Sequence, residues 1–539
     1  MKKIILLVLS FIMTVSTVSL TGCKKGNKNG NVLEIAVNIG GYGSDSFKAI
    51  ARKFEEEHEG TEVNVSDVYL RADQLEANLK NPRASKTDLY VTGNGTMLKG
   101  YVSKGDKFSS SYKGVILEEI SDVYNSKVDG EDITVGDKMY DQFREFHTWD
   151  LNDDGEEEHY IMPWHANIMS FIYNTTVVNK ALNGKPIPRT TLEFEQLCKA
   201  IKADGVNPFV LTLDPSAHYW QGPVETWWAQ YETVEEYNNF FRGISDGKFS
   251  KDIYRARGRL VGLKEMERFI FASNGYIHKN SPSFEFATAQ NTLFSGVSAF
   301  MANGCWFENE MKLSDSKKDN IAMMKTPVTS VIVEKLSFYN DGDYFALSDS
   351  KKNEYDLILA GIVGYVDGNI ERENLDARVK DSDIEIIRKA RRIAKTNASS
   401  SSMFIPAFAK NKELAKEFLK FMVRDDNLVL FMNKSSGSHL VYDFDFSKEE
   451  NKKVFNGLSA FRKSVYEIEK DCDLIRFVNE PIQYKGGLEP YADLSTQVES
   501  YMISANAGDR KTAQEIYDHC IKYMDDDRWS NILRLSGNL

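Results

Sequence analysis

The sequence predicts an α/β fold with a largely parallel sheet, in a chain long enough for two domains or a pair of lobes. Apolar residues alternate from Leu33 to Val37, as they do in a strand. An apolar helical stripe at Phe47 and Phe54 follows, and Val63 begins another alternating run. This strand-helix-strand order is typical of a parallel crossover, and 539 residues exceed the usual length of a single domain.

Two glycine-rich turns follow predicted strands in the first hundred residues. One turn contains Gly41 and Tyr42, and the other contains Gly93 and Asn94, after the predicted buried strand at 87–91. Ligands of open α/β sheets bind beyond the carboxyl ends of the strands. Both turns are therefore candidate ligand-facing loops, with tight-turn formation as the alternative reason for their glycines.

Composition and charge exclude several classes of protein. With 31 Phe, 25 Tyr and 7 Trp, the chain can bury a large core, so disorder throughout is excluded. The formal net charge of −12 argues against a nucleic-acid binder, which would present a basic surface. Five cysteines without a Cys-x-x-Cys pair indicate neither a disulfide framework nor a zinc site. Any pairing among Cys305, Cys472 and Cys520 stays open, because it depends on distances.

The first residues have the pattern of an export signal. A basic Met-Lys-Lys start precedes an apolar run at 4–20 that is marginal for a membrane span but suits a signal peptide. The run ends in Leu-Thr-Gly-Cys23, which resembles the lipobox of bacterial lipoproteins. That resemblance implies a signal peptide at 1–22, a lipidated Cys23 with a flexible tether to residue 31, and a protein anchored on the extracellular face of the cell membrane. The alternative is an ordinary signal peptide with an incidental cysteine.

Motifs of catalysis and metal binding give little support for an enzyme. The sequence lacks Gly-x-Ser-x-Gly, His-Glu-x-x-His, P-loop and Gly-x-Gly-x-x-Gly patterns. A glycosidase carboxylate pair stays open, because its diagnostic is a spatial separation. Asp150, Asn152 and Asp154 match the first half of a calcium loop, but the twelfth position is Ile161, which favours an acidic hairpin turn. We expect no enzymatic activity, no cofactor and no metal.

Several segments, in order along the chain, carry a more specific pattern. They are Tyr-Ile-Met-Pro at 160–163 with Phe-Ile-Tyr-Asn at 171–174, the Pro-Arg-Thr helix entry at 188–190, the run 294–306 ending in Asn-Gly-Cys-Trp, the Lys-Asn-Lys-Glu helix at 410–422, and a closing helix after Thr512. Together they resemble the extracellular solute-binding proteins of sugar-type ABC importers, the family that includes maltose-binding protein. The chain is longer than a typical member, with the excess between Ser330 and Ser402.

The resemblance implies a two-lobed, periplasmic-binding-protein-like (type II) fold with a hinge and a ligand cleft between the lobes. It assigns 32–162 and 328–435 to the first lobe, with a helical insertion at about 335–402, and 163–327 and 436–539 to the second lobe. It further implies a monomer that captures a carbohydrate, an oligosaccharide in particular, by closure of the lobes and delivers it to the permease subunits of an ABC transporter.

Ligand contacts are predicted from the aromatic and polar residues near these segments. Aromatic rings pack on the C–H faces of sugars, and carboxylates and amides bond the hydroxyls. For each aromatic residue, packing in the core is the alternative. The candidates are Trp164, His165, Trp220, Trp228 and Trp306 as aromatic contacts, and Tyr42, Asn94 and Glu308 as polar contacts.

Three other functions stay open at this stage. A secreted carbohydrate-active enzyme would share the export signal and the aromatic residues but would turn over a glycan. A surface glycan-binding or adhesion lipoprotein would share the anchor without needing a cleft that closes. A binding protein for a peptide or another polar solute would share the fold but not the ligand.

Overall fold

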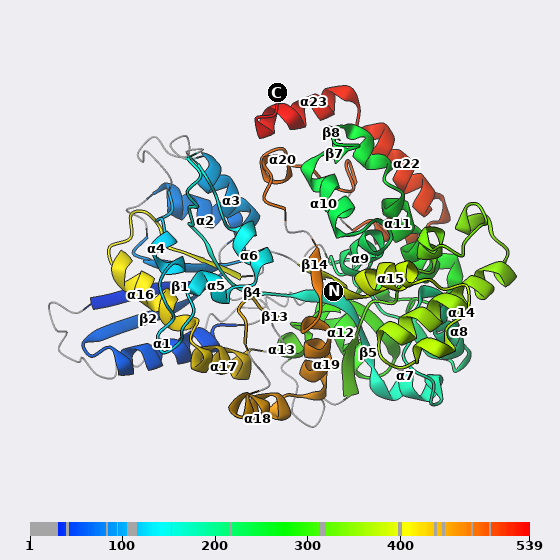
Figure 1. Ribbon diagram of the computed structural model, residues 1–539, viewed down its shortest axis with the longest axis horizontal. Helices are drawn as coiled ribbons and strands as arrows, with labels where there is room; N and C mark the ends of the chain where they lie inside the picture. The colour runs from blue at the N-terminus through cyan, green and yellow to red at the C-terminus, as the bar shows by residue number, and fades with distance from the viewer. Residues whose placement is uncertain are drawn as a thin grey trace, which may run out of the picture.

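Two sheets, each at the centre of its own lobe, organise the chain (Figure 1). The protein is described here from a computed structural model. It describes residues 31–539 except 39–42, 70, 82–84, 94, 105–115, 152–153, 215–217, 312–319, 397–400, 436–438, 445–447, 476–477 and 495–496.

The first lobe is built on a six-stranded sheet in the order β13-β4-β12-β3-β1-β2. β1 pairs in parallel with β2 and β3, which confirms the predicted parallel unit. The pairs β12–β3, β12–β4 and β13–β4 are antiparallel, so the sheet is mixed and not largely parallel as predicted. Phe47, Ile50 and Phe54 of α1 are buried against this sheet, as their helical spacing predicts. The strands are β1 (Asn31–Asn38), β2 (Thr61–Val68), β3 (Leu89–Thr92), β4 (Met162–Ala166), β12 (Ser401–Phe404) and β13 (His439–Leu440). The helices are α1 (Asp45–Glu57), α2 (Ala72–Lys80), α3 (Gly95–Lys104), α4 (Ser121–Tyr124), α5 (Val135–Lys138), α6 (Asp141–Phe146), α16 (Lys412–Met422) and α17 (Asp425–Lys434).

The second lobe is built on the sheet β14-β11-β5-β9-β6, with β10 also paired to β5. Its strands are β5 (Ile168–Asn174), β6 (Asn207–Phe209), β9 (Ser298–Gly304), β10 (Ile321–Met324), β11 (Ile393–Thr396) and β14 (Asp473–Ile475). The helices of this lobe are α7 (Thr175–Leu182), α8 (Thr191–Ala203), α9 (Gln221–Glu232), α10 (Val234–Arg242), α11 (Arg257–Ile270), α12 (Phe286–Phe294), α13 (Phe307–Met311), α14 (Asp349–Val366), α15 (Asp381–Arg392), α19 (Ala460–Glu469), α20 (Pro481–Tyr484), α21 (Glu499–Met502), α22 (Ala513–Tyr523) and α23 (Asp526–Ser536). α18 (Glu449–Gly457) contacts α17 of the first lobe.

Glycines allow the two central helices of the second lobe to approach closely. A Cβ on Gly262 of α11 would lie 2.4 Å from the carbonyl oxygen of Val224 on α9, and one on Gly258 would collide with Trp228. Only glycine fits positions where backbones come this near. The close approach lets α9 and α11 form one buried layer beneath the sheet.

The chain crosses between the lobes three times. The first crossing is at Asn167, between β4 of the first sheet and β5 of the second. The second runs from β11 to β12, and the third lies between β13 and α19, which packs on β10. One apolar cluster continues through this region, from Trp164 in the first lobe to Met301 and Phe461 in the second. The crossings therefore sit on a shared core.

All three predicted lobe boundaries differ from the structure, the first by only a few residues. The second crossing lies after Thr396, whereas the prediction placed it between residues 327 and 328. The third was predicted after residue 435, but β13 still pairs with β4, so the return to the second lobe lies further along the chain. The first boundary, predicted after residue 162, lies four residues later, at the end of β4.

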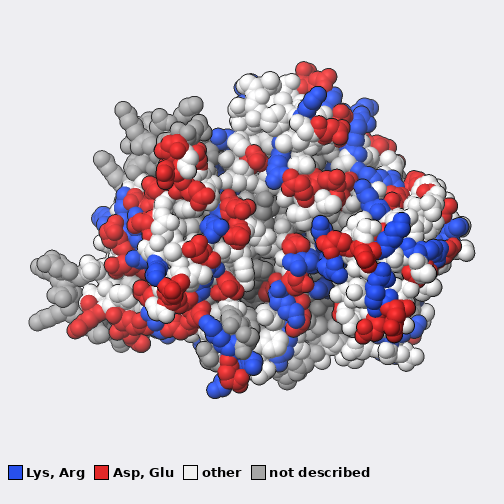
Figure 2. Space-filling view, in the orientation of Figure 1, with Lys and Arg blue, Asp and Glu red and all other residues white. Residues whose placement is uncertain are grey.

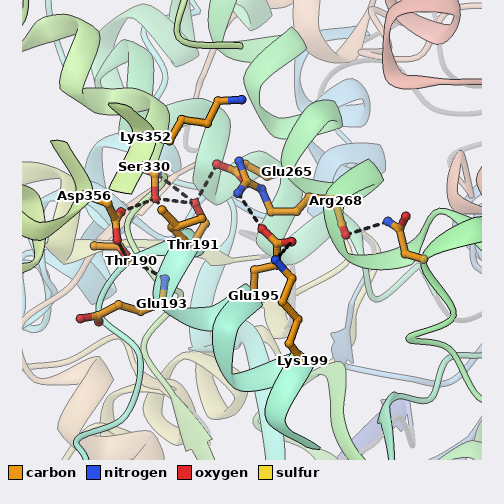
Figure 3. A network of polar contacts seen from close by, with 12 residues as sticks. Thr190, Thr191, Glu193, Glu195, Lys199, Glu265, Arg268, Ser330, Lys352 and Asp356 are labelled. Carbon is orange, nitrogen blue, oxygen red and sulfur yellow. Dashed lines mark hydrogen bonds and ion pairs between the residues drawn. The ribbon is translucent and has the colours of Figure 1, made fainter. Parts of the chain in front are cut away.

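The helical insertion packs on the second lobe, which corrects its predicted place on the first (Figure 3). Asp356 of α14 accepts hydrogen bonds from Thr190 at 2.8 Å and from Ser330 at 2.6 Å. Thr191, at the start of α8, donates to Glu265 of α11 at 2.8 Å. Burial raises the pKa of Asp356 to about 6. Asp356 thus joins the insertion to the start of α8, and Thr191 joins α8 to α11; both are second-lobe helices.

Charged side chains are distributed differently over the two lobes. Figure 2 shows acidic side chains over much of the first lobe and both signs of charge interleaved on the second, without a broad basic face in this view. No helix in the part of the chain that the structure describes has the length and apolarity needed to cross a bilayer. The predicted signal peptide and Cys23 lie outside the described residues.

Candidate functional site

The ends of several strands from both sheets meet where the chain crosses between the lobes. In the first sheet, β3 ends opposite the start of β12, with Thr92 paired to Ser402, and β4 ends at Ala166 beside them. In the second sheet, β9 ends where β5 begins, with Gly304 paired to Met169. We call this region the interlobe edge. A ligand held there would touch loops of both lobes.

The two predicted first-lobe loops leave strands that end at the interlobe edge. β1 ends at Asn38, four residues before Tyr42, and β3 ends at Thr92, two residues before Asn94. Tyr42 and Asn94 themselves lie outside the described residues, so their ligand contacts stay predictions.

Trp306 lies at the interlobe edge, directly after β9. Its indole ring is half-buried and rests against Gly304, where a Cβ would lie 2.1 Å from a ring carbon. The side chain of Asn303 accepts the Gly304 N–H at 2.7 Å, which fixes the turn. The glycine of the Asn-Gly-Cys-Trp motif is thus needed for the ring to fold back on the backbone.

Tyr219 forms an aromatic pair with Trp306. The ring centroids lie 6.3 Å apart with an angle of 45° between the planes, and both rings are half-buried. Tyr219 comes from the loop after β6, which runs parallel to β9, so the two loops leave the sheet at the same edge. The sequence analysis named the neighbouring Trp220 as a candidate and did not name Tyr219.

Polar groups surround this aromatic pair. Glu310 accepts a hydrogen bond from the buried Gln290 at 2.6 Å, and burial raises the pKa of the Glu310 carboxyl. Burial and the nearby Glu310 raise the pKa of Tyr219, whereas hydrogen bonding with Trp306 and Asn303 lowers it. Tyr219 therefore keeps its hydroxyl proton at neutral pH and can both donate and accept. The pair thus combines flat apolar faces with hydroxyl, amide and carboxylate groups.

Glu308, a predicted polar contact, is buried and bonded within the second lobe. One of its carboxylate oxygens accepts from the Ser459 hydroxyl at 2.9 Å and from Arg462 Nε at 3.3 Å. Both partners belong to the start of α19. This carboxylate therefore ties α13 to α19.

Trp164 and His165 lie in the core of the first lobe, next to the hinge. Trp164 is fully buried, and its ring centroid lies 5.1 Å from that of Phe431. His165 stacks on the same ring at 5.5 Å, and burial lowers its pKa to about 3. Both residues therefore pack among core side chains, which is the alternative that the sequence left open.

Trp220 and Trp228 are also core residues. Trp220 packs at 5.5 Å against Phe171 and at 5.6 Å against Phe209, beneath the second sheet. Trp228 packs between α9 and α10, with Tyr237 at 4.8 Å. Of the predicted aromatic contacts, Trp306 is the one that the structure places, partly exposed, at the interlobe edge.

The acidic loop at residues 150–157 has the geometry of a turn. Asp150 accepts the N–H groups of Asp154 at 3.1 Å and Gly155 at 3.0 Å. Trp149 and Glu158 form an antiparallel bridge on either side. Asn152 lies outside the described residues, and among those described no group of three or more His, Cys, Asp or Glu is placed to hold a metal.

No disulfide bond joins the cysteines of the described residues. Cys198, Cys305 and Cys520 are buried and Cys472 is half-buried. Cys198 lies on the inner face of α8 with Phe194 and Leu197.

Two hollows on the second lobe lie away from the interlobe edge. One, of about 570 Å³, borders the polar network of Figure 3 between α8, α11 and α14. Its charges are paired with one another, because Arg268 bonds Glu265 at 2.9 Å and Glu195 at 3.1 Å. The other, of about 710 Å³, lies beside α23 and the loop at Gly486. Neither hollow receives loops from both sheets.

Comparisons with known proteins agree on one family and one fold. The family model described as bacterial extracellular solute-binding protein matches residues 40–428. The xylose/arabinose-binding protein XacG of Haloferax volcanii is 24% identical over 338 residues, which cover 60% of this chain and 64% of that protein.

Solved structures with 14–16% identity share the fold over nearly the whole chain. A chitin oligosaccharide binding protein aligns with a TM-score of 0.55 over 93% of this chain and 99% of its own. Maltose-bound MalE3 of T. maritima aligns with a TM-score of 0.55 over 91% and 98%, and RafE in complex with raffinose with 0.54 over 91% and 98%. The two-lobed architecture is common to this chain and to these proteins.

Proposed function

Because this chain belongs to the bacterial extracellular solute-binding proteins, we propose that it captures a carbohydrate between its lobes and delivers it to the permease of an ABC transporter. The similar proteins named above bind xylose or arabinose, chitin oligosaccharides, maltose and raffinose, as their names state. These ligands are neutral and rich in hydroxyl groups, and three of the four names denote an oligosaccharide or a disaccharide.

The observation that carries the proposal is the aromatic pair of Trp306 and Tyr219 at the interlobe edge. Sugar rings present apolar C–H faces that pack on aromatic rings. Glu310 and the Tyr219 hydroxyl are only partly buried and suit the hydroxyl groups at the rim of a sugar. A peptide or an ion would not use both the flat aromatic faces and the polar groups beside them.

Capture follows from the way the lobes are joined. Three crossings on a shared core allow the lobes to move relative to each other while each keeps its own sheet. A ligand that contacts Trp306 in the second lobe and the loops of Tyr42 and Asn94 in the first is bound best when the lobes are close together. Its binding energy therefore shifts the population towards the closed arrangement that the permease recognises.

Attachment to the membrane is part of the proposal and rests on Cys23. A lipid on this residue would keep the binding protein near its permease on the extracellular face. Labelled palmitate should be incorporated into the wild-type chain and not into Cys23→Ala, which should be released into the medium. Retention of Cys23→Ala in the membrane would contradict the anchor.

The test of function is thermal unfolding of residues 24–539 with a panel of mono- and oligosaccharides. A sugar present at 100 times its Kd stabilises the folded state by about 2.7 kcal/mol, which shifts the midpoint visibly. We expect at least one sugar to do so and to be recovered unchanged. Consumption of the sugar would favour a carbohydrate-active enzyme, and a shift with peptides alone would replace the carbohydrate by another polar solute.

A further inference from the structure

The lobes also touch at a point away from the three crossings. Asn479, in the second-lobe segment between β14 and α20, bonds two groups of the first lobe. Its side-chain oxygen accepts from Lys99 Nζ of α3 at 2.9 Å, and its side-chain N–H donates to the Thr148 carbonyl at 2.6 Å. In Figure 1, α3 and α20 face each other across the upper end of the gap between the lobes.

Each side of this contact is fixed to its own lobe. Val478 and Ile482, on either side of Asn479, are buried in the second-lobe cluster that contains Trp228. Leu98, next to Lys99, is buried in the first-lobe cluster that contains Trp149. Neither partner can follow the other when the lobes separate, so separation must break both hydrogen bonds.

Lys99 is an unusual partner for such a contact, because its side chain is only 1% exposed. The ammonium lies over the ring of Phe146, 3.8 Å from its centroid, and 4.6 Å from that of Trp149. It also donates to the Phe146 carbonyl. The surrounding apolar rings lower the pKa of Lys99 through burial. A hydrogen bond that an ammonium group donates inside the protein, away from water, is stronger than the same bond in water.

The amide of Asn479 is suited to both of its partners. Its oxygen faces a donor, Lys99, and its nitrogen faces an acceptor, the Thr148 carbonyl. Aspartate could accept from Lys99 but would place a second acceptor against Thr148, and an apolar residue could do neither. The geometry therefore selects an amide at this position.

We propose that Asn479 is an interlobe clamp that holds the lobes together through Lys99 and Thr148 and so sets the affinity for the ligand. The effect on affinity rests on the proposed function, in which the ligand binds the closed arrangement. When only a fraction of molecules is closed, the apparent Kd rises in inverse proportion to that fraction. α3 begins directly after residue 94, so the clamp holds the helix that follows a predicted ligand loop.

The clamp is tested by the distance between the lobes, measured without any sugar. Spin labels on Lys127→Cys in the first lobe and Lys389→Cys in the second, both exposed positions, report the distance by pulsed electron paramagnetic resonance. Cys472→Ser removes the half-buried native thiol from the background. We expect Asn479→Ala to move the distance distribution to longer values and Asn353→Ala, an exposed asparagine on α14, to leave it unchanged.

Lys99→Met is the second variant, because it removes the ammonium and keeps apolar packing between Phe146 and Trp149. It too should lengthen the distance. For a sugar found in the thermal panel, both variants should bind roughly tenfold more weakly than the wild type. Unchanged distances in both variants overturn the clamp. Longer distances with unchanged affinity overturn its effect on binding. If no sugar binds the wild type, the distances still decide the clamp, and the proposed function alone fails.

Discussion

Tyr219 and Trp220 are neighbours in sequence but occupy opposite surroundings. Tyr219 is half-buried at the interlobe edge beside Trp306, whereas Trp220 is packed between Phe171 and Phe209 beneath the sheet. The difference arises because the loop after β6 turns into α9 between them, so consecutive side chains point to the edge and to the core. A dense run of aromatic residues therefore does not by itself locate a binding site; its position relative to the strand ends does.

The comparison separates the remaining aromatic candidates in the same way. Trp164 and Trp228 share the buried surroundings of Trp220, whereas Trp306 follows the end of β9 and rests on Gly304. We therefore expect substitutions in the first group to change stability and substitutions at the edge to change affinity.

The largest effect is expected at Trp220. Trp220→Ala leaves a cavity beside Phe171 and Phe209 and should lower the free energy of unfolding by about 3–5 kcal/mol. Urea unfolding of the variant and the wild type measures the difference. A loss below about 1 kcal/mol would show that the site is not part of the tightly packed core.

At the interlobe edge, Trp306→Ala should leave stability nearly unchanged and weaken sugar binding. Loss of a central aromatic contact costs about 2 kcal/mol of binding free energy, or roughly thirtyfold in Kd. Isothermal titration with the best sugar of the panel gives the affinity, and urea unfolding gives the stability. Unchanged affinity would remove Trp306 from the site and with it the main support for the proposal.

His165 offers a pH test of whether a predicted contact belongs to the core. Its pKa is about 3 in the folded protein, because burial disfavours the charged ring, and about 6.5 in the unfolded chain. Between these values the unfolded state binds more protons, so stability falls as the pH drops below about 6.5. At pH 5 the loss from this residue is about 2 kcal/mol.

The matched variant for this test is His165→Gln, which does not titrate. Its free energy of unfolding should fall less than that of the wild type between pH 7 and pH 5. His147, whose pKa burial also lowers to about 3, is present in both proteins and cancels in the comparison. Equal pH dependence of the two proteins would mean that His165 keeps an ordinary pKa, as an exposed cleft residue would.

The smallest effect is expected from Gly304→Ala. The added methyl group would lie 2.1 Å from the Trp306 ring, so the ring must turn away from the backbone. A displaced but intact indole should weaken sugar binding by about fivefold, or about 1 kcal/mol. Gly457→Ala, whose methyl group meets no atom within 4 Å, is the control for the same titration. Equal affinities in both variants would show that the position of the ring on Gly304 does not matter.

Local sequence patterns predicted the elements of the fold but not their assignment to lobes. The first parallel unit and the helix entry at Thr190 follow from spacings within a few residues, and both are present. The insertion was assigned to the wrong lobe, because its place depends on the buried bonds of Asp356 to Thr190 and Ser330. Those partners are distant in sequence and form no local pattern.

The site was predictable to a similar extent. Resemblance to the family's Asn-Gly-x-Trp signature pointed to Trp306, and the structure places this residue directly after β9, at the edge of the sheet. Its contact with a ligand stays a prediction. Tyr219 and Glu310 were missed, because their approach to Trp306 depends on how two separate loops fold back. The clamp at Asn479 joins elements nearly 400 residues apart and has no local signal at all.

The most direct test of the central claim is small-angle X-ray scattering of residues 24–539 with and without the sugar that gives the largest thermal shift. The claim is that ligand binds between the lobes and favours their closure. We expect the radius of gyration to decrease when the sugar is added to the wild type, and Trp306→Ala to require a higher sugar concentration for the same decrease. Saturating binding to the wild type without any compaction would contradict the account.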